Sequence, residues 1–160
     1  RQRQMCIRDS PYWVVPDFEN FRGQLFEMLD EQQSEWGIFT AAVADYQPEY
    51  VYDGKWSSEE FVRTLNLKQT PKLIEEVRAL LPVLKMIPFK YEEAVSHEEL
   101  MVTACRRLEK GGYPLLVANR GDESRETGNQ VAWLIRSGEE PLRMEGKFEI
   151  RFTMRFFLMN

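Results

Sequence analysis

Short apolar runs alternate with longer amphipathic stretches along this sequence, and this alternation restricts the folds that the chain can adopt. Four runs have the apolar character of buried strands: GIFTAAVA (37–44), VLKMIPF (83–89), LLVAN (115–119) and QVAWLI (130–135). A further candidate strand is LNLKQ (65–69), in which apolar and polar residues alternate. Strands that alternate with helices of about ten to fifteen residues are typical of parallel sheets. The sequence therefore predicts an α/β fold with a parallel sheet.

The helix boundaries can be placed from capping residues. Asp17 stands at an N-cap position before apolar residues spaced three and four apart, which predicts an amphipathic helix to about Gln33. Thr70-Pro71 predicts a second helix start, with Thr70 as the cap. Ser96 to Glu99 matches a capping box, and Gly111-Gly112 is expected to close the helix that it starts. Each of these helices precedes one of the predicted strands.

Composition excludes several classes of protein. With 160 residues the chain suits one domain or an incomplete one, and it has no apolar run near the roughly 20 residues of a membrane helix. Two cysteines and one histidine are too few for a disulfide scaffold or a zinc cluster. The net charge of −5 argues against general affinity for duplex DNA. We therefore expect a soluble, cytoplasmic protein with neither nucleic acid nor membrane as partner and with no metal-binding cluster of its own.

The first ten residues, RQRQMCIRDS, differ from the rest. Three arginines against one aspartate give this segment a charge of +2, so residues 11–160 carry −7. The segment has neither a helical nor a strand period. We interpret residues 1–10 as a non-native leader and exclude them from the fold; a disordered basic arm is the alternative.

Polar residues follow the predicted strands where a ligand is expected. Because ligands of parallel α/β sheets bind beyond the carboxyl ends of the strands, the residues to inspect are Asp45, Gln69-Thr70-Pro71, Phe89-Lys90 and Asn119. Each of them could instead serve only a turn or a helix start. Their common placement favours one shared crevice.

Residues 45–64 form an unusually long connection with several aromatic residues. The segment also contains a single lysine, Lys55. Long ordered loops at strand ends are often functional flaps, and a lysine on such a flap is a plausible contact for phosphate.

Four blocks in order resemble one family. TAAVADYQPEYVYDGKWSS (40–58), LKQTPKLIEEV (67–77), IPFKYEE (87–93) and LLVAN (115–119) are similar to the phosphopantothenate–cysteine ligase family, which acts in the second step from pantothenate to coenzyme A. The family's AAVADY motif is matched at 41–46, and Lys55 follows Asp45 by ten residues, as the flap lysine does in the family. The resemblance implies a Rossmann-like, mainly parallel sheet flanked by helices.

The resemblance also implies a reaction and a set of site residues. The family joins 4′-phosphopantothenate to cysteine through an acyl-nucleotide intermediate, with CTP or ATP as co-substrate and Mg²⁺ as cofactor, and homodimers bring the flap close to the site. Lys55 would be catalytic and would reach the nucleotide phosphates. The nucleotide-binding residues would be Phe39, Thr40, Ala41, Asp45, Lys55, Thr70, Pro71, Lys72, Leu73, Phe89, Arg107 and Lys110, with Asn119 beside them. Arg107 and Lys110 equally suit a helix C-terminus through the helix dipole.

The sequence departs from the family pattern at both ends. The initial strand, its glycine loop and the R-x-I-x-N and S-S-G motifs are missing, so we expect residues 11–150 to be a partial domain that lacks its N-terminal βα unit and, as a 160-residue chain, lacks ligase activity. Trp56 replaces an aliphatic flap residue, and the aromatic, basic tail 151–160 is atypical. Two other functions stay open, namely a fragment of a Rossmann-type NAD(P)-dependent oxidoreductase and a non-catalytic α/β interaction module.

Overall fold

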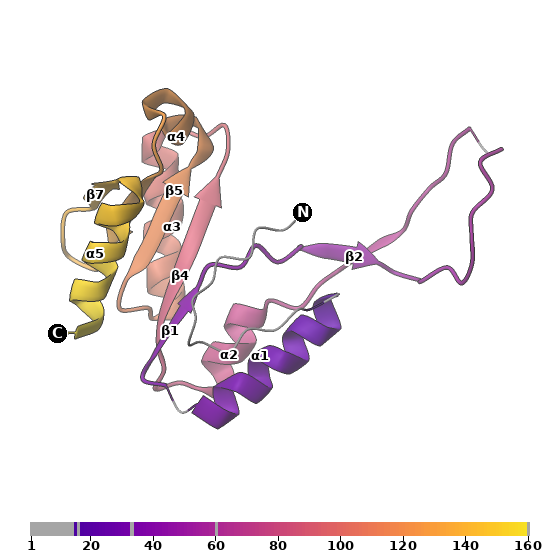
Figure 1. Ribbon diagram of the computed structural model, residues 1–160, viewed down its shortest axis with the longest axis horizontal. Helices are drawn as coiled ribbons and strands as arrows, with labels where there is room; N and C mark the ends of the chain where they lie inside the picture. Colours follow the sequence, from indigo (N-terminus) through magenta and orange to yellow (C-terminus); the bar gives the residue numbers. More distant parts are fainter. Residues whose placement is uncertain (1–14, 16, 33, 60, 160) are drawn as a thin grey trace. The chain divides into compact units, whose positions relative to one another are not determined.

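The computed structural model describes residues 15, 17–32, 34–59 and 61–159, which fall into two compact units (Figure 1). The first unit, residues 1–33, contains one described helix, α1 (Phe18–Gln32). The Asp17 carboxylate accepts a hydrogen bond from the Asn20 backbone N–H at 2.8 Å, as expected of an N-cap. The predicted helix and its cap are confirmed, whereas the proposed leader, residues 1–10, lies outside the described residues.

The second unit is built on a five-stranded mixed sheet with the strand order β1-β4-β5-β6-β7. The strands are β1 (Trp36–Phe39), β4 (Lys85–Glu92), β5 (Leu116–Arg120), β6 (Val131–Ile135) and β7 (Leu142–Glu145). Strands β1, β4 and β5 are parallel, whereas β6 and β7 are each antiparallel to the strand before them. The predicted α/β, Rossmann-like fold is confirmed, with parallel pairing among β1, β4 and β5 and antiparallel pairing of β6 and β7.

The reversal at β6 has a simple geometric cause. A parallel neighbour needs a crossover of about a dozen residues or more, and residues 121–130 between β5 and β6 are fewer and are largely occupied by the short helix α4 (Gly121–Thr127). Strand β7 then follows through a tight loop in which Gly138 adopts a φ of 74°. The sequence reasoning identified neither α4 nor β7.

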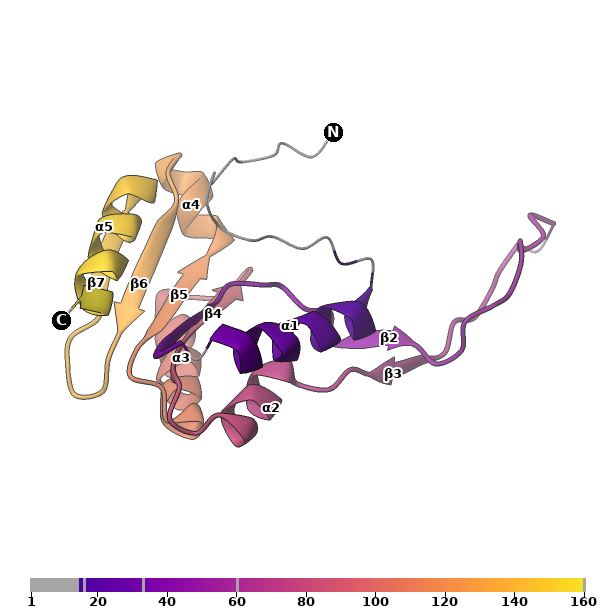
Figure 2. The ribbon, with the colours of Figure 1, turned by 60° about the horizontal axis from the view of Figure 1, so that its bottom comes forward.

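Two helices cover opposite faces of the sheet: α3 (His97–Gly111) lies on one and α5 (Gly146–Met159) on the other (Figures 1 and 2). On the α5 side, Ile87, Val117 and Met144 of the sheet pack with Met154 of the helix in one buried cluster. The capping box at Ser96 is confirmed, and Gly112 ends α3 in the left-handed conformation. No helix in the described ranges is long and apolar enough to cross a bilayer.

Two boundary predictions were wrong. The run 37–44 forms a strand only up to Phe39, and Ile38 is 46% exposed because β1 is an end strand of the sheet that pairs with β4 alone. Helix α2 (Leu73–Leu80) starts after Lys72, not at Thr70. Residues that precede proline are driven to extended conformations, and Thr70 uses its hydrogen-bonding groups elsewhere.

The predicted strand 65–69 exists but lies outside the main sheet. Strand β3 (Leu67–Gln69) pairs antiparallel with β2 (Tyr46–Pro48) in a separate two-stranded ribbon. From this ribbon, the described residues between β2 and β3, 49–59 and 61–66, run outward as an extended arm (Figure 1). Val51 and Phe61 on the arm are almost fully exposed.

The predicted tail, residues 151–160, is helical through Met159, the last residue that the structure describes. These residues continue α5, and Met154 among them is buried against the sheet. The C-terminal segment is therefore an integrated part of the second unit.

Candidate functional site

The base of the β2–β3 ribbon is closed by three contacts to Ala44 and Asp45. The Thr70 backbone N–H donates to the Asp45 carbonyl oxygen at 2.9 Å, and the buried Thr70 hydroxyl donates to the Ala44 carbonyl oxygen. The Lys72 ammonium forms an ion pair with the Asp45 carboxylate at 2.5 Å. These contacts bring the end of the AAVADY segment against the residues that lead into α2.

The Asp45 carboxylate lies in a positive field. Its pKa is lowered, first by the hydrogen bond and charge of Lys72 and then by the charges of Lys90 and Arg107. These three cations come from different elements, namely the start of α2, strand β4 and helix α3. Asp45 is thus held ionised among cations that the sequence separates by up to 62 residues.

A second pair adjoins the first. The Lys110 ammonium donates to the Glu75 carboxylate at 2.9 Å, which joins the end of α3 to α2. The pKa of Glu75 is lowered by Lys110 first and by Lys72 and Arg107 further away. We call Lys72, Lys90, Arg107 and Lys110 the cation cluster.

The members of the cation cluster differ in how they are paired. Lys90 is only 24% exposed and pairs with Glu92 at 2.8 Å, while Lys72 and Lys110 hold Asp45 and Glu75. Arg107 forms no ion pair with any residue that the structure describes. A cluster in which cations exceed nearby carboxylates can accept an anion, because charge-assisted hydrogen bonds to phosphate oxygens are stronger than hydrogen bonds between neutral groups.

The other predicted pocket residues separate into two groups. Phe39 ends β1, and Thr40 and Ala41 follow it toward Asp45. The Phe39 ring lies over Gly37, where an added Cβ would come within 2.8 Å of the ring. Leu73 is buried at the start of α2, and Pro71 beside it is exposed. Residues 39–41 thus precede Asp45 in the chain, and Pro71 and Leu73 flank Lys72.

Phe89 and Asn119 lie elsewhere. Phe89 packs against the buried cluster on the α5 side of the sheet, so alternation along β4 directs Lys90 to the other face. Asn119 is opposite Tyr91 in the β4–β5 pairing, and no described contact joins it to Asp45. The structure thus joins Asp45, Thr70 and Lys72 by direct contacts, and it leaves Phe89 and Asn119 apart from them.

Lys55 lies on the exposed arm, and no ion pair joins it to any residue that the structure describes. Its neighbour Trp56 makes two ring contacts. The ring packs edge-on against Tyr52, and the guanidinium of Arg63 lies over it. The aromatic residues of the arm therefore pack with one another, while Lys55 faces solvent.

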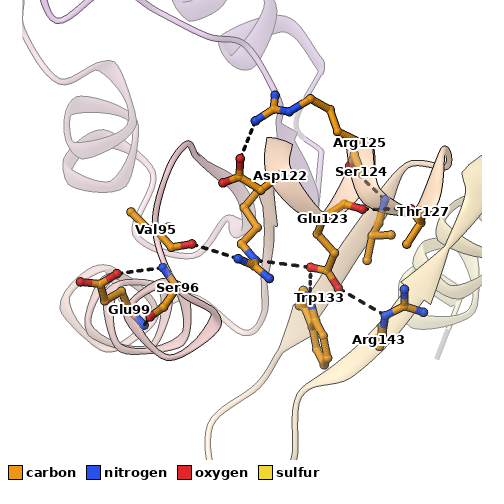
Figure 3. Close-up of polar contacts among 12 residues, drawn as sticks. Val95, Ser96, Glu99, Asp122, Glu123, Ser124, Arg125, Thr127, Trp133 and Arg143 are labelled. Atoms are coloured by element: carbon orange, nitrogen blue, oxygen red, sulfur yellow. Dashed lines mark hydrogen bonds and ion pairs between the residues drawn. The ribbon is translucent and has the colours of Figure 1, made fainter.

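A polar network that the sequence reasoning missed holds the carboxyl-terminal ends of β4 and β5 (Figure 3). The buried Glu123 carboxylate accepts a hydrogen bond from Trp133 Nε1 at 3.0 Å and pairs with Arg143 at 3.4 Å and Arg120 at 3.7 Å. Arg120 also donates to the Val95 carbonyl oxygen at 3.0 Å, just before α3. No sequence signal marks Glu123, because its partners Arg120, Trp133 and Arg143 lie on three different strands, β5, β6 and β7.

A salt-bridge network adjoins it at the end of β4. The Arg125 guanidinium binds both Glu93 and Asp122, and Asp122 accepts a hydrogen bond from the Ala94 backbone N–H at 3.0 Å. Hydrogen bonds from Arg125 and Tyr91 lower the pKa of Glu93 to about 2. A Cβ added at Gly121 would lie 2.2 Å from a Glu93 carboxylate oxygen and 2.3 Å from the Tyr91 hydroxyl, so these two side-chain ends would have to shift.

The described residues contain no group of three metal-ligating side chains. Asp45, Glu75 and Glu92 each pair with one cation of the cluster. Mg²⁺ is commonly held by one or two carboxylates together with substrate phosphates. At Asp45 one such carboxylate is present, paired with Lys72, and the described residues around it form no dedicated metal cage.

The fold and the site together define an α/β domain with a cluster of cations around Asp45 at the base of a two-stranded ribbon. Residues 23–152 match the family described as the DNA/pantothenate metabolism flavoprotein C-terminal domain. This match covers most of the chain, and the chain belongs to that family, the phosphopantothenate–cysteine ligases that the sequence blocks indicate.

Two curated relatives are coenzyme A biosynthesis bifunctional proteins CoaBC. The protein from Thermococcus kodakarensis is 35% identical over 100 residues, which cover 58% of this chain and 25% of the relative. The protein from Methanocaldococcus jannaschii is 38% identical over 82 residues, which cover 51% of this chain and 20% of the relative. The chain thus spans about a quarter or less of the length of these relatives.

Solved structures support the same fold. The crystal structure of the DNA/pantothenate metabolism flavoprotein from Streptococcus pneumoniae superposes with a TM-score of 0.73 at 25% identity, covering 85% of this chain and 68% of that one. The C-terminal domain of a CoaBC protein superposes with a TM-score of 0.63 at 17% identity, covering 91% and 63% of the two chains. At that identity the second likeness concerns the fold alone.

Proposed function

We propose that this chain is the nucleotide-binding portion of a phosphopantothenate–cysteine ligase of coenzyme A biosynthesis. The observation that carries the proposal is the cation cluster around Asp45, which lies in the segment that resembles the family's AAVADY motif. The curated relatives are named for coenzyme A biosynthesis, and the family match includes every residue of the cluster.

The reaction class explains why cations are needed. A carboxylate is a poor electrophile, so the carboxylate of 4′-phosphopantothenate attacks the α-phosphorus of CTP or ATP, and pyrophosphate leaves. The amine of cysteine then attacks the acyl carbon, the nucleoside monophosphate leaves, and an amide bond forms. Negative charge accumulates on the phosphates in the first step, and fixed cations stabilise it.

The residues have distinct proposed roles. Lys72, Arg107 and Lys110 bind the triphosphate, and Asp45 would contact the nucleotide and would be the residue that holds a Mg²⁺ ion bound with it. Magnesium supplies further neutralisation of phosphate charge when bound. Phe39, Thr40 and Ala41 line the approach to the base.

We further propose that the arm is the flap of this site. Lys55 is its one cation within residues 49–59 and would reach the phosphates when the arm closes, from its own subunit or from a partner in a homodimer. Asn119 is assigned beside the site, and Phe89 to the pocket wall, by the resemblance alone.

The first experiment is calorimetric titration of the 160-residue chain with CTP and with ATP in the presence of Mg²⁺. Arg107→Ala removes a cation that holds no described carboxylate, so the fold is expected to survive the change. We expect nucleotide affinity to fall roughly ten- to a hundredfold, the value of one charged hydrogen bond. Arg106→Ala is the matched control, because Arg106 is its exposed neighbour on α3, and we expect affinity within about twofold of the wild type.

Two results would refute the site. One is equal weakening by both arginine substitutions; the other is absence of binding by either nucleotide. Tighter binding of NAD(P) than of CTP or ATP would favour the oxidoreductase alternative.

For the flap, Lys55→Ala in a full-length ligase context is expected to cripple turnover of 4′-phosphopantothenate and cysteine while the melting temperature stays unchanged. Normal turnover in this variant would remove Lys55 from the site.

A further inference from the structure

The outward face of α5 carries a row of large apolar side chains. Phe148, Phe152, Phe156 and Met159 are 83%, 65%, 58% and 71% exposed, and spacings of four, four and three place them on one side of the helix. We call these four residues the α5 stripe. The opposite side of the helix packs on the sheet through Ile150, Met154, Phe157 and Leu158. Helix α5 is thus apolar on both faces, although the sheet covers only one.

A row of basic residues flanks the α5 stripe. Lys147, Arg151 and Arg155 are all exposed and follow one another at intervals of four residues. The single acidic residue of the helix, Glu149, accepts a hydrogen bond from the Glu145 backbone N–H at 2.9 Å. Three cations against one carboxylate give α5 a charge of +2. Because the whole chain has a net charge of −5, the residues outside α5 carry −7.

A second copy of this chain fits the α5 stripe poorly. With aromatic side chains of about 150–250 Å² each, the stripe exposes on the order of 500 Å², below the roughly 800 Å² per partner of a stable pair. In an antiparallel, two-fold symmetric pair of α5 helices, the two basic rows would also lie on the same side. Like charges would then face each other across the contact.

The sequence alone predicts no membrane partner; against that expectation, we propose that α5 docks this chain on an anionic lipid surface. A helix with an exposed aromatic face and adjacent basic residues can lie in the interface plane, with its apolar side chains at the headgroup boundary and its cations beside lipid phosphates. A convex helix face meets a flat bilayer without needing a complementary groove. The chain would thereby be held at the membrane surface without crossing it.

The test is co-sedimentation of the 160-residue chain with vesicles of phosphatidylcholine alone and of phosphatidylcholine with 30% phosphatidylserine. Arg151→Gln with Arg155→Gln removes two cations, and at about fivefold per cation we expect affinity for the anionic vesicles to fall roughly 30-fold. Lys68→Gln with Arg106→Gln makes the same change in net charge at exposed positions outside α5. This control pair is expected to bind within about twofold of the wild type.

The apolar contribution has its own pair of variants. Phe148→Gln with Phe152→Gln is expected to weaken vesicle binding at least tenfold, whereas Phe61→Gln with Val62→Gln, on the exposed arm, is expected to leave it unchanged. Far-UV circular dichroism confirms that each variant is folded.

The proposal is overturned by equal binding to both vesicle types, by no binding, or by α5 variants that bind like the wild type. A dimer in sedimentation velocity that the α5 substitutions dissociate would assign the α5 stripe to a second copy instead.

Discussion

Replacement of Glu123 by alanine should destabilise the second unit more than any surface substitution. The change leaves the Trp133 indole N–H, which now donates at 3.0 Å, without its partner, and it leaves Arg120 and Arg143 without their shared carboxylate. Removing one member of a buried ion pair costs about 3–5 kcal/mol. Arg143 is 39% exposed and can be rehydrated, so the lower end applies. We expect a loss of about 3 kcal/mol in the free energy of unfolding.

Urea unfolding followed by tryptophan fluorescence and circular dichroism measures this loss. For a chain of this size it corresponds to roughly 6–12 °C in melting temperature. Glu126→Ala is the matched control, because Glu126 lies on the same short helix and is exposed, and it should change the free energy by less than about 0.5 kcal/mol. Glu123→Gln retains an acceptor for Trp133 and should fall between the two. Equal midpoints for the Glu123→Ala and Glu126→Ala variants would refute the reasoning.

Three further predictions concern other contacts. Thr70→Val removes the buried hydroxyl that donates to Ala44 and should cost about 1–3 kcal/mol in thermal unfolding, with Thr70→Ser near the wild type; a Val variant as stable as the wild type would contradict this role. Ser96→Ala removes the α3 cap and should cost about 1 kcal/mol in urea unfolding, and no change would show that the cap is dispensable. The pKa of Glu93 is lowered from 4.5 to about 2 by Arg125, so its stabilising effect is complete above about pH 4.5 and is lost as the pH falls toward 2. Melting temperatures of Glu93→Gln should accordingly depend less on pH in that window than those of the wild type, and parallel pH profiles would count against the pair.

The predictable parts of the fold are those with local signals. The Ser96 capping box and the Asp17 N-cap rest on residues three apart, so their geometry is readable from the chain. Buried strands such as β4 and β5 are apolar for most of their length. By contrast, the direction of β6 depends on the length of a connection, and the exposure of β1 depends on its place at the end of the strand order.

The candidate site was predictable to the extent that its residues lie in motifs. Asp45, Thr70 and Lys72 follow from sequence blocks, and the structure brings them into contact. Glu75 was missed, because its partner Lys110 is 35 residues away and no local pattern pairs them. Phe89 was expected in the same crevice as Asp45, yet the alternation of β4 turns it toward α5.

By itself, the sequence determined the class of fold, the family and the caps of two helices, because apolar periodicity, motif spacing and capping act over a few residues. The tertiary structure decided which strands are parallel, that β2 and β3 form a ribbon of their own, and that cations from α2, β4 and α3 gather around one carboxylate. It also brought the Glu123 carboxylate to the Trp133 indole N–H and left an aromatic row on the outer side of α5. These features depend on side chains that are distant in the chain, and only packing fixes their relative positions.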